Sequence, residues 1–121
     1  MRRGPDERGS ATLLVVACAG VLLMLGAALA VVAAMVAAHR TAQAAADLAA
    51  LAGAAAAGDG ADPCTAAASV AAANGASLTD CRADGTQVSV VVLAAGPHWL
   101  GQPDDLTARA RAGPEEVVLS R

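Results

Sequence analysis

The chain has 121 residues, a formal net charge of -3 and a single aromatic side chain, Trp99. This length leaves room for at most one small domain beside any membrane segment. The acidic balance excludes an ordinary nucleic-acid binder, since phosphate binding requires a clustered basic face. Roughly three residues in ten are Ala and every basic residue is Arg, which is typical of a GC-rich genome. So few large apolar side chains predict a marginal core that depends on a disulfide or a partner surface.

The first predicted element is a membrane-spanning helix. Residues 9–38 carry no charged side chain, and about 20 apolar residues already cross a hydrocarbon layer of ~30 Å. A cleaved secretory signal has an apolar core of only about 7–15 residues, so we expect an anchor. Arg2, Arg3 and Arg8 precede the run and only Arg40 follows closely, which predicts a cytoplasmic N-terminus. The sequence thus predicts a single-pass protein of the cytoplasmic (inner) membrane with an extracytoplasmic C-terminal domain.

The helix is expected to begin near Ser10, a suitable N-cap, and to continue beyond the membrane because no proline occurs until Pro63. Glycine at positions 58 and 60 ends it. The emergent part is amphipathic: its polar face comprises Arg40, Gln43 and Asp47, and its apolar face comprises Ala44, Leu48, Leu51 and Ala55. The expected organisation is a charged cytoplasmic leader (residues 1–9), a transmembrane helix (10–38), an emergent amphipathic helix (39–57) and a small extracytoplasmic α+β domain (58–121).

The exported part predicts a short helix followed by an antiparallel sheet, so the fold class is α+β. Asp62 and Pro63 are typical of an N-cap and first helical position, which places a helix at residues 63–73. Strands are expected at residues 78–82, 86–94 and 106–112, with an Asp84-Gly85 hairpin signature between the first two. Residues 96–105 are a predicted loop, and residues 115–121 form either an edge strand or a loose tail.

The cysteines agree with export. Cys64 and Cys81 lie in the exported part, where disulfides form and persist, and we expect them to be bonded to each other. Cys18 lies inside the span and is interpreted as a small packing residue. The cysteine and histidine spacing does not predict a metal site.

The sequence contains no recognisable catalytic constellation, so we expect no enzyme, no cofactor and no small-molecule substrate. His39 flanks the span beside Arg40, and His98 lies in a loop. Both positions are ordinary for a histidine that performs no chemistry.

Three segments could contact partners. Small residues recur at every fourth position of the span, a pattern that allows another helix to pack closely but that also arises by chance in an Ala-rich segment: Gly26, Ala30, Ala34 and Ala38. The apolar run of residues 88–93 requires cover on both faces and is a candidate docking surface. Trp99 could anchor a partner or cover its own sheet.

The order of charged leader, Arg8-Gly9, apolar helix and the segment from His39 to Ala54 resembles TadE/TadG-like proteins of the tight-adherence (Flp) pilus and secretion systems. It is especially similar to short TadE-like proteins of GC-rich actinobacteria. The resemblance covers roughly residues 8–57, and the residues that carry it most strongly are Gln43, Asp47, Leu48, Leu51 and Gly53.

The resemblance implies a minor pilin-like or pseudopilin-like component whose helix packs into or beneath a pilus-like assembly. Its partners would be other pilus-assembly membrane proteins and a prepilin peptidase that cuts after Gly9 and leaves Ser10 as the new N-terminus. Such proteins usually carry Glu at the fifth mature position, where this chain has Leu14. The alternative is a membrane-anchored extracytoplasmic binding or regulatory module with no connection to pili.

Overall fold

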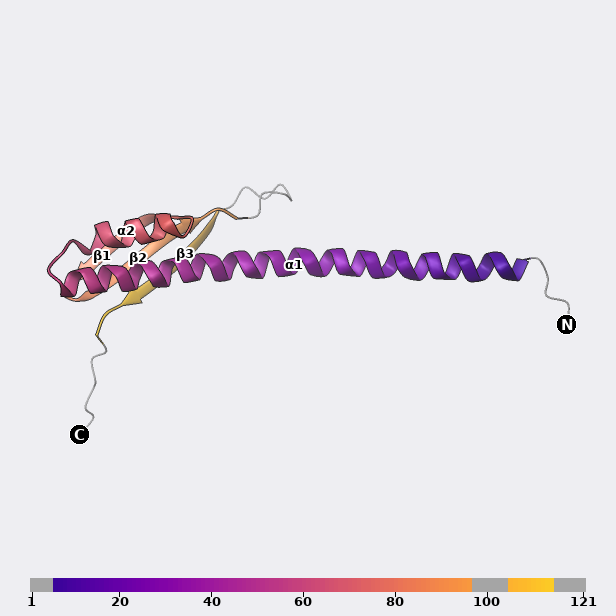
Figure 1. Cartoon of the computed structure of the whole chain (residues 1–121), viewed down its shortest axis with the longest axis horizontal. Coiled ribbons are helices and arrows are strands. Elements are labelled where there is room, and N and C mark those ends of the chain that lie inside the picture. The colour runs from indigo at the N-terminus through magenta and orange to yellow at the C-terminus, as the bar shows by residue number, and fades with distance from the viewer. Residues whose placement is uncertain (1–5, 97–104, 115–121) are drawn as a thin grey trace, which may run out of the picture. The chain divides into compact units, whose positions relative to one another are not determined.

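The computed structural model describes residues 6–96 and 105–114. Its elements are α1 (Asp6–Gly58), α2 (Pro63–Ala73), β1 (Ala76–Asp84), β2 (Gln87–Ala94) and β3 (Leu106–Ala112) (Figure 1). A long apolar helix, a short helix and a three-stranded antiparallel sheet confirm the predicted α+β class. The chain divides into two compact units, Met1–Ala34 and Met35–Arg121. The boundary falls within α1, so each unit is considered by itself.

The first unit is the N-terminal part of α1. Every side chain from residue 9 to residue 30 is exposed, including Leu23 at 74% and Met24 at 76%. A helix that is apolar all round and uncovered by protein is typical of a membrane span. α1 is long and apolar enough to cross a membrane, with a mean hydropathy of 2.7 over its most apolar window. The helix begins at Asp6, so the prediction of a start near Ser10 was wrong. No proline interrupts residues 6–9, and the backbone hydrogen bonds therefore extend through them.

The second unit contains the sheet, in which β2 lies between β1 and β3. The β1–β2 hairpin is one residue out of step with its predicted signature. Asp84 pairs with Gln87, so the two loop residues are Gly85 and Thr86 rather than Asp84 and Gly85. Gly85 has φ 61° and no described non-glycine residue has positive φ, which corresponds to a type II′ turn. β1 is also longer than predicted, because it continues through an irregularity between Leu78 and Asp80.

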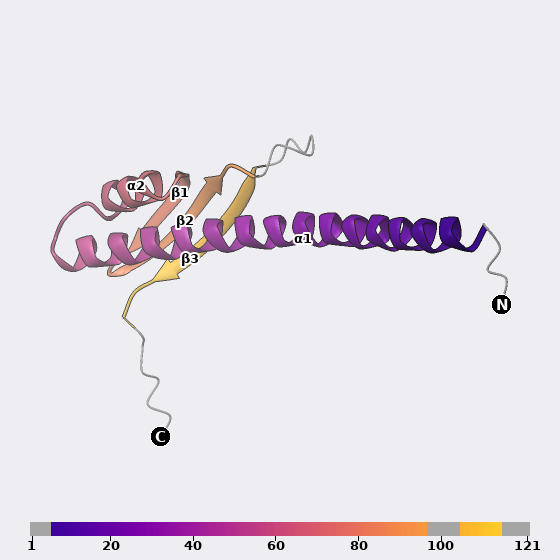
Figure 2. The same cartoon turned by 45° about the vertical axis from the view of Figure 1, so that its right-hand side comes forward.

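The core of the second unit lies between one face of the sheet and the two helices. Val88, Val90 and Val92 of β2 are at most 1% exposed, and every second residue of β2 is buried. Alanines complete this core, and they come mainly from the C-terminal part of α1 and from α2: Ala42, Ala45, Ala46, Ala49, Ala50, Ala67 and Ala71. In both views these two helices lie beside the sheet (Figures 1 and 2).

α2 begins as the sequence predicts. Asp62 is the N-cap: its carboxylate accepts from the Cys64 backbone N–H at 3.1 Å and from the Thr65 hydroxyl at 2.8 Å. These hydrogen bonds, the Thr65 one first, lower the pKa of the Asp62 carboxyl. Cys64, in the first turn, is disulfide-bonded to Cys81 of β1, with 5.8 Å between the Cα atoms. The bond fixes the start of α2 to the sheet.

Candidate functional site

The C-terminal part of α1 presents two opposite faces. Its alanines from Ala42 to Ala50 at the sheet-facing positions are at most 2% exposed. Leu48 and Leu51, by contrast, are 46% and 59% exposed, and Ala44 and Ala55 are exposed with them. The helical repeat of 3.6 residues places these four on the side away from the sheet. We name this stripe the outward face.

The sequence prediction that Ala44, Leu48, Leu51 and Ala55 form the apolar face is correct as a pattern. The side of the helix that packs on the domain is formed instead by the alanines opposite this face. Alanine allows the helix backbone to approach the valines of β2 closely, whereas leucine in the same place would hold the helix away from the sheet.

At Gly53, α1 lies close to β2 and to the start of α2. A Cβ at this position would lie 2.9 Å from Val88 Cγ1 and 3.1 Å from the Pro63 carbonyl oxygen. Real Cβ atoms essentially never come within 3.0 Å of another heavy atom, so the packing of α1 on β2 and on the start of α2 requires glycine here. Among the residues that carry the family resemblance, Gly53 thus has a clear structural role.

Gln43 and Asp47 act together on the flank of α1. The Gln43 side-chain amide donates to Asp47 Oδ1 at 3.0 Å and to the backbone carbonyl of Arg109 at 2.9 Å. β3 is an edge strand, so its outward carbonyls require partners. The Gln43 amide is the hydrogen-bond partner of one such carbonyl, that of Arg109, and this bond joins α1 to the edge of the sheet.

The remaining predicted residues of α1 lie along the helix without converging on one point. Gly9, Ser10, Cys18, Gly26 and Ala30 are exposed in the first unit. Ala34 and Ala38 are half-buried, and Ala38 belongs to the second unit. The fourth-residue spacing places Gly26, Ala30 and Ala34 on neighbouring turns of the helix, so a helix-packing stripe stays a prediction.

The run of residues 88–93 is divided between two surroundings. Val88, Val90 and Val92 form the core of the unit, so the prediction that the whole run is a docking surface was wrong for these three. Val91 and Leu93 are half-buried on the other side of the sheet. Side chains alternate along a strand, and no described helix covers this second side. We name it the open face.

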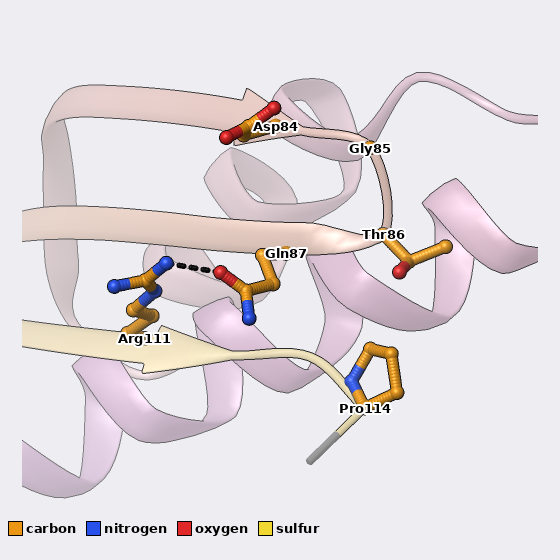
Figure 3. Close-up of a pocket in the computed structure, with 6 residues that line it drawn as sticks. All are labelled: Asp84, Gly85, Thr86, Gln87, Arg111 and Pro114. Carbon is orange, nitrogen blue, oxygen red and sulfur yellow. Dashed lines mark hydrogen bonds between the residues drawn. The ribbon is translucent and has the colours of Figure 1, made fainter. Parts of the chain in front are cut away.

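The open face is rich in arginine. The strand register places the side chains of Arg109 and Arg111 on the same side as Val91 and Leu93 of β2, with Arg82 on β1. Beside the hairpin, a polar cavity of about 420 Å³ lies between Asp84, Gln87 and Arg111 (Figure 3). The Arg111 guanidinium donates to Gln87 Oε1 there, so the Arg111 side chain points from β3 toward β2 (Figure 3).

The described residues contain no group of three or more His, Cys, Asp or Glu that could hold a metal ion. Trp99 and His98 lie outside the described residues, as do most of the predicted 96–105 loop and the 115–121 segment. Sequence reasoning assigned no functional role to Arg109 and Arg111. Their Arg-Ala-Arg alternation was visible, but their proximity to Arg82 depends on a register that only the folded sheet supplies.

Comparison of the chain with models of protein families tests the predicted resemblance. Residues 9–56 match the family described as putative Flp pilus-assembly TadE/G-like. The predicted resemblance is therefore confirmed over this segment, which is somewhat less than half of the chain. No curated protein and no solved structure matches the chain.

The TadE/G-like segment coincides with α1, from Gly9 to just before the helix ends at Gly58. It therefore includes the exposed apolar part of the first unit and, in the second unit, both the alanines that pack on the sheet and the outward face. The sheet itself lies beyond the matched residues, so the open face is a feature of this chain's own structure.

Proposed function

We propose that this protein is a non-catalytic component of a Tad (Flp)-type pilus or secretion apparatus, of minor pilin-like or pseudopilin-like character. It acts by packing its helix against other helices in the cytoplasmic membrane and by docking its exported domain on partner proteins. The observation that carries the proposal is the TadE/G-like match over residues 9–56 on a helix whose apolar side chains from residue 9 to residue 30 are exposed.

The outward face supports helix packing beyond the span. Its members follow one another at intervals of four, three and four residues (Ala44, Leu48, Leu51 and Ala55), which is the spacing of a coiled-coil seam. Large apolar side chains left exposed on a small domain are typical of interaction surfaces. The domain does not need this face for its own core, so it is available to a helix of another assembly protein.

The proposed topology follows from the Arg-rich leader. The N-terminus lies in the cytoplasm, the span covers residues 10–38, and residues 39–121 lie outside the membrane. The disulfide between Cys64 and Cys81 supports this placement, since an extracytoplasmic compartment preserves such bonds. The Arg-only, Ala-rich composition supports a source among GC-rich bacteria, in keeping with the short actinobacterial type.

A prepilin peptidase is the proposed processing partner, with cleavage after Gly9. Removal of Arg2, Arg3 and Arg8 would free the helix to leave the bilayer for a helix bundle. The intact mass of the protein isolated from membranes of its own cells tests this step. A chain that begins at Ser10 supports a pilin-like role despite Leu14, whereas a retained leader indicates a permanent anchor and an accessory role.

The proposed function is tested by deleting the coding sequence and measuring the filament protein sheared from the cell surface. We expect the deletion to abolish filament and the wild-type chain to restore it. A Leu48→Asp/Leu51→Asp double variant should fail to restore it although it folds, because it places charges on the outward face. An Ala68→Asp/Ala72→Asp variant on exposed positions of α2 is the matched control and should restore filament. Normal filament in the deletion strain would instead favour an anchored binding module unrelated to pili.

A further inference from the structure

The open face has an ordered arrangement of side chains across its three strands. Ser89, Val91 and Leu93 of β2 each stand between one residue of β3 and one of β1. From one end to the other the rows are Thr107–Leu93–Ser77, Arg109–Val91–Asp80 and Arg111–Ser89–Arg82. Arginine therefore stands on both sides of Ser89 near the hairpin and on one side of Val91, opposite Asp80.

Positive charge is concentrated on this face although the chain as a whole is acidic. Of the four Arg that the structure describes in the second unit, all except Arg40 lie here. Most of the described acidic residues of that unit lie elsewhere. They are Asp47, Asp59, Asp62 and Asp105, which leaves only Asp80 and Asp84 on the strands of this face.

The arginines are only partly neutralised. Asp80 forms an ion pair with Arg82 at 3.9 Å, and both side chains are largely exposed. Arg111 donates to an uncharged partner, Gln87. Within the described residues the Arg109 guanidinium has no hydrogen bond or ion pair. The face therefore retains the capacity to bind carboxylates.

The face is also hollowed. A depression of about 570 Å³ lies over it, and its lining includes Arg82, Ser89, Val91, Arg109 and Arg111. Val91 contributes a half-buried apolar floor, and Asp80 is the one carboxylate of the lining. Leu93, also half-buried, lies on the same side of β2 outside the lining. An apolar centre with arginine at its rim is the usual composition of a protein-binding surface.

The spacing of the arginines fits an extended chain. Alternate residues of a strand are ~7 Å apart, so Arg109 and Arg111 match acidic side chains at alternate positions of an extended peptide. Arg82 and Arg111 stand on either side of Ser89 and about 10 Å apart, since neighbouring strands are ~4.8 Å apart. A guanidinium donates two parallel hydrogen bonds to a carboxylate, which makes arginine the suitable cation for this contact.

We infer that the open face docks an extended, acidic segment of a protein partner, whose carboxylates pair with Arg82, Arg109 and Arg111 and whose apolar side chains cover Val91 and Leu93. This inference deepens the docking part of the proposed function and rests on it. A nucleic acid is disfavoured by the chain's net charge of -3, and the apolar side chains of Val91 and Leu93 next to the arginines favour a peptide over a simple anion.

The test uses the purified full chain in detergent and a fluorescein-labelled peptide in which every second residue is glutamate or valine and the residues between them are serine, so that the extended peptide presents carboxylates and apolar side chains on one face. Binding is measured by fluorescence anisotropy, and a peptide with glutamine in place of glutamate is the matched probe. We expect only the acidic peptide to bind. The Arg82→Gln/Arg109→Gln/Arg111→Gln variant should bind ~10-fold more weakly, since three exposed charge pairs each contribute between about 1.4-fold and fivefold. Arg40→Gln, which removes a charge outside the face, should leave binding unchanged.

A second variant protects the test against loss of folding. Arg109→Glu alters the guanidinium of the open face that has no partner within the described residues, so the variant should have the same melting temperature as the wild-type chain. Its binding of the acidic peptide should still fall severalfold. Equal binding of both peptides, or equal loss with Arg40→Gln, would overturn the inference.

Other occupants give different results. Binding to phosphatidylserine vesicles but not to the peptide identifies a lipid surface, and a dimer that the triple variant abolishes identifies a second copy of the chain. Either result overturns the inference. The peptide assay is also independent of filament assembly. Absent peptide binding with filament still lost on deletion refutes the docking surface alone, whereas peptide binding with normal filament refutes the proposed function alone.

Discussion

Two parts of α1 place similar sequence in different surroundings. From residue 9 to residue 30 every side chain is exposed, and the large apolar residues cover the helix on all sides. From residue 42 to residue 53 the helix buries one face, and that face consists of alanine and glycine while Leu48 and Leu51 remain outside. In the first part hydrophobicity suits a lipid solvent. In the second part, the buried residues are the small ones, because the core requires α1 to lie close to β2.

The largest expected difference between the two parts concerns charge. Leu23→Arg should raise the free energy of membrane insertion by about 2.5–3.5 kcal/mol, because it places a cation near the middle of the apolar run. Leu51→Arg introduces the same side chain on the outward face, where Leu51 is 59% exposed, and should change neither insertion nor folding. Membrane fractionation of the two variants measures the effect. Equal membrane content of both would contradict the assignment of residues 10–38 as the span.

The second unit depends on a covalent link that the first lacks. Replacing Cys64 and Cys81 by Ala should lower the free energy of unfolding by about 3 kcal/mol, since the bond closes a loop with a sequence separation of 17 residues. A core of alanines and three valines has little stability to spare, so the reduced domain is expected to lose its cooperative thermal transition. Cys18→Ala is the matched control and should leave the transition unchanged. An unaltered transition in the double variant would show that packing alone maintains the domain.

Two glycine substitutions in α1 compare a crowded position with an open one. Gly53→Ala should destabilise the second unit by about 1–2 kcal/mol, because overpacking outweighs the gain in helix propensity. Gly58→Ala adds the same methyl group where nothing lies within 4 Å, so it should be neutral or slightly stabilising. Chemical denaturation of both variants gives the comparison. If Gly53→Ala were as harmless as Gly58→Ala, the close contact with Val88 would not limit the packing.

Local signals explain which elements the sequence predicts well. The bounds of α2 agree with the expected residues 63–73 because Asp62 and Pro63 start the helix and Asn74 and Gly75 follow its end. β3 agrees with residues 106–112 because alanine and polar residues alternate throughout it. Both patterns depend only on neighbours in the sequence, so no tertiary contact can shift them far.

Tertiary contacts explain the rest. Nothing in the α1 sequence says that Ala46, rather than Leu48, is buried, since both are apolar and the choice depends on the shape of the β2 valines. The irregularity between Leu78 and Asp80 changes which residues of β1 share a face, and the alternation of single residues does not reveal it. The cluster of Arg82, Arg109 and Arg111 on the open face follows from that register and was accordingly missed.

The smallest expected effect concerns the cap of α2. The pKa of Asp62 is lowered by the Thr65 hydroxyl and the Cys64 N–H, so the ionised carboxylate stabilises the folded state. Its contribution is present above the unfolded-state pKa near 4 and is lost as pH falls through the lower folded-state value.

Asp62→Asn keeps an acceptor but does not titrate. The wild-type chain should therefore unfold at a higher temperature than Asp62→Asn at pH 6, and the difference should begin to shrink near pH 4 and vanish once the pH lies below the lowered folded-state pKa. Asp59→Asn is the control, because the Asp59 side chain makes no hydrogen bond within the described residues. A difference between wild type and Asp62→Asn that does not change with pH would mean that the amide and the carboxylate cap α2 equally well, and that the helix is maintained by Pro63 and the disulfide instead.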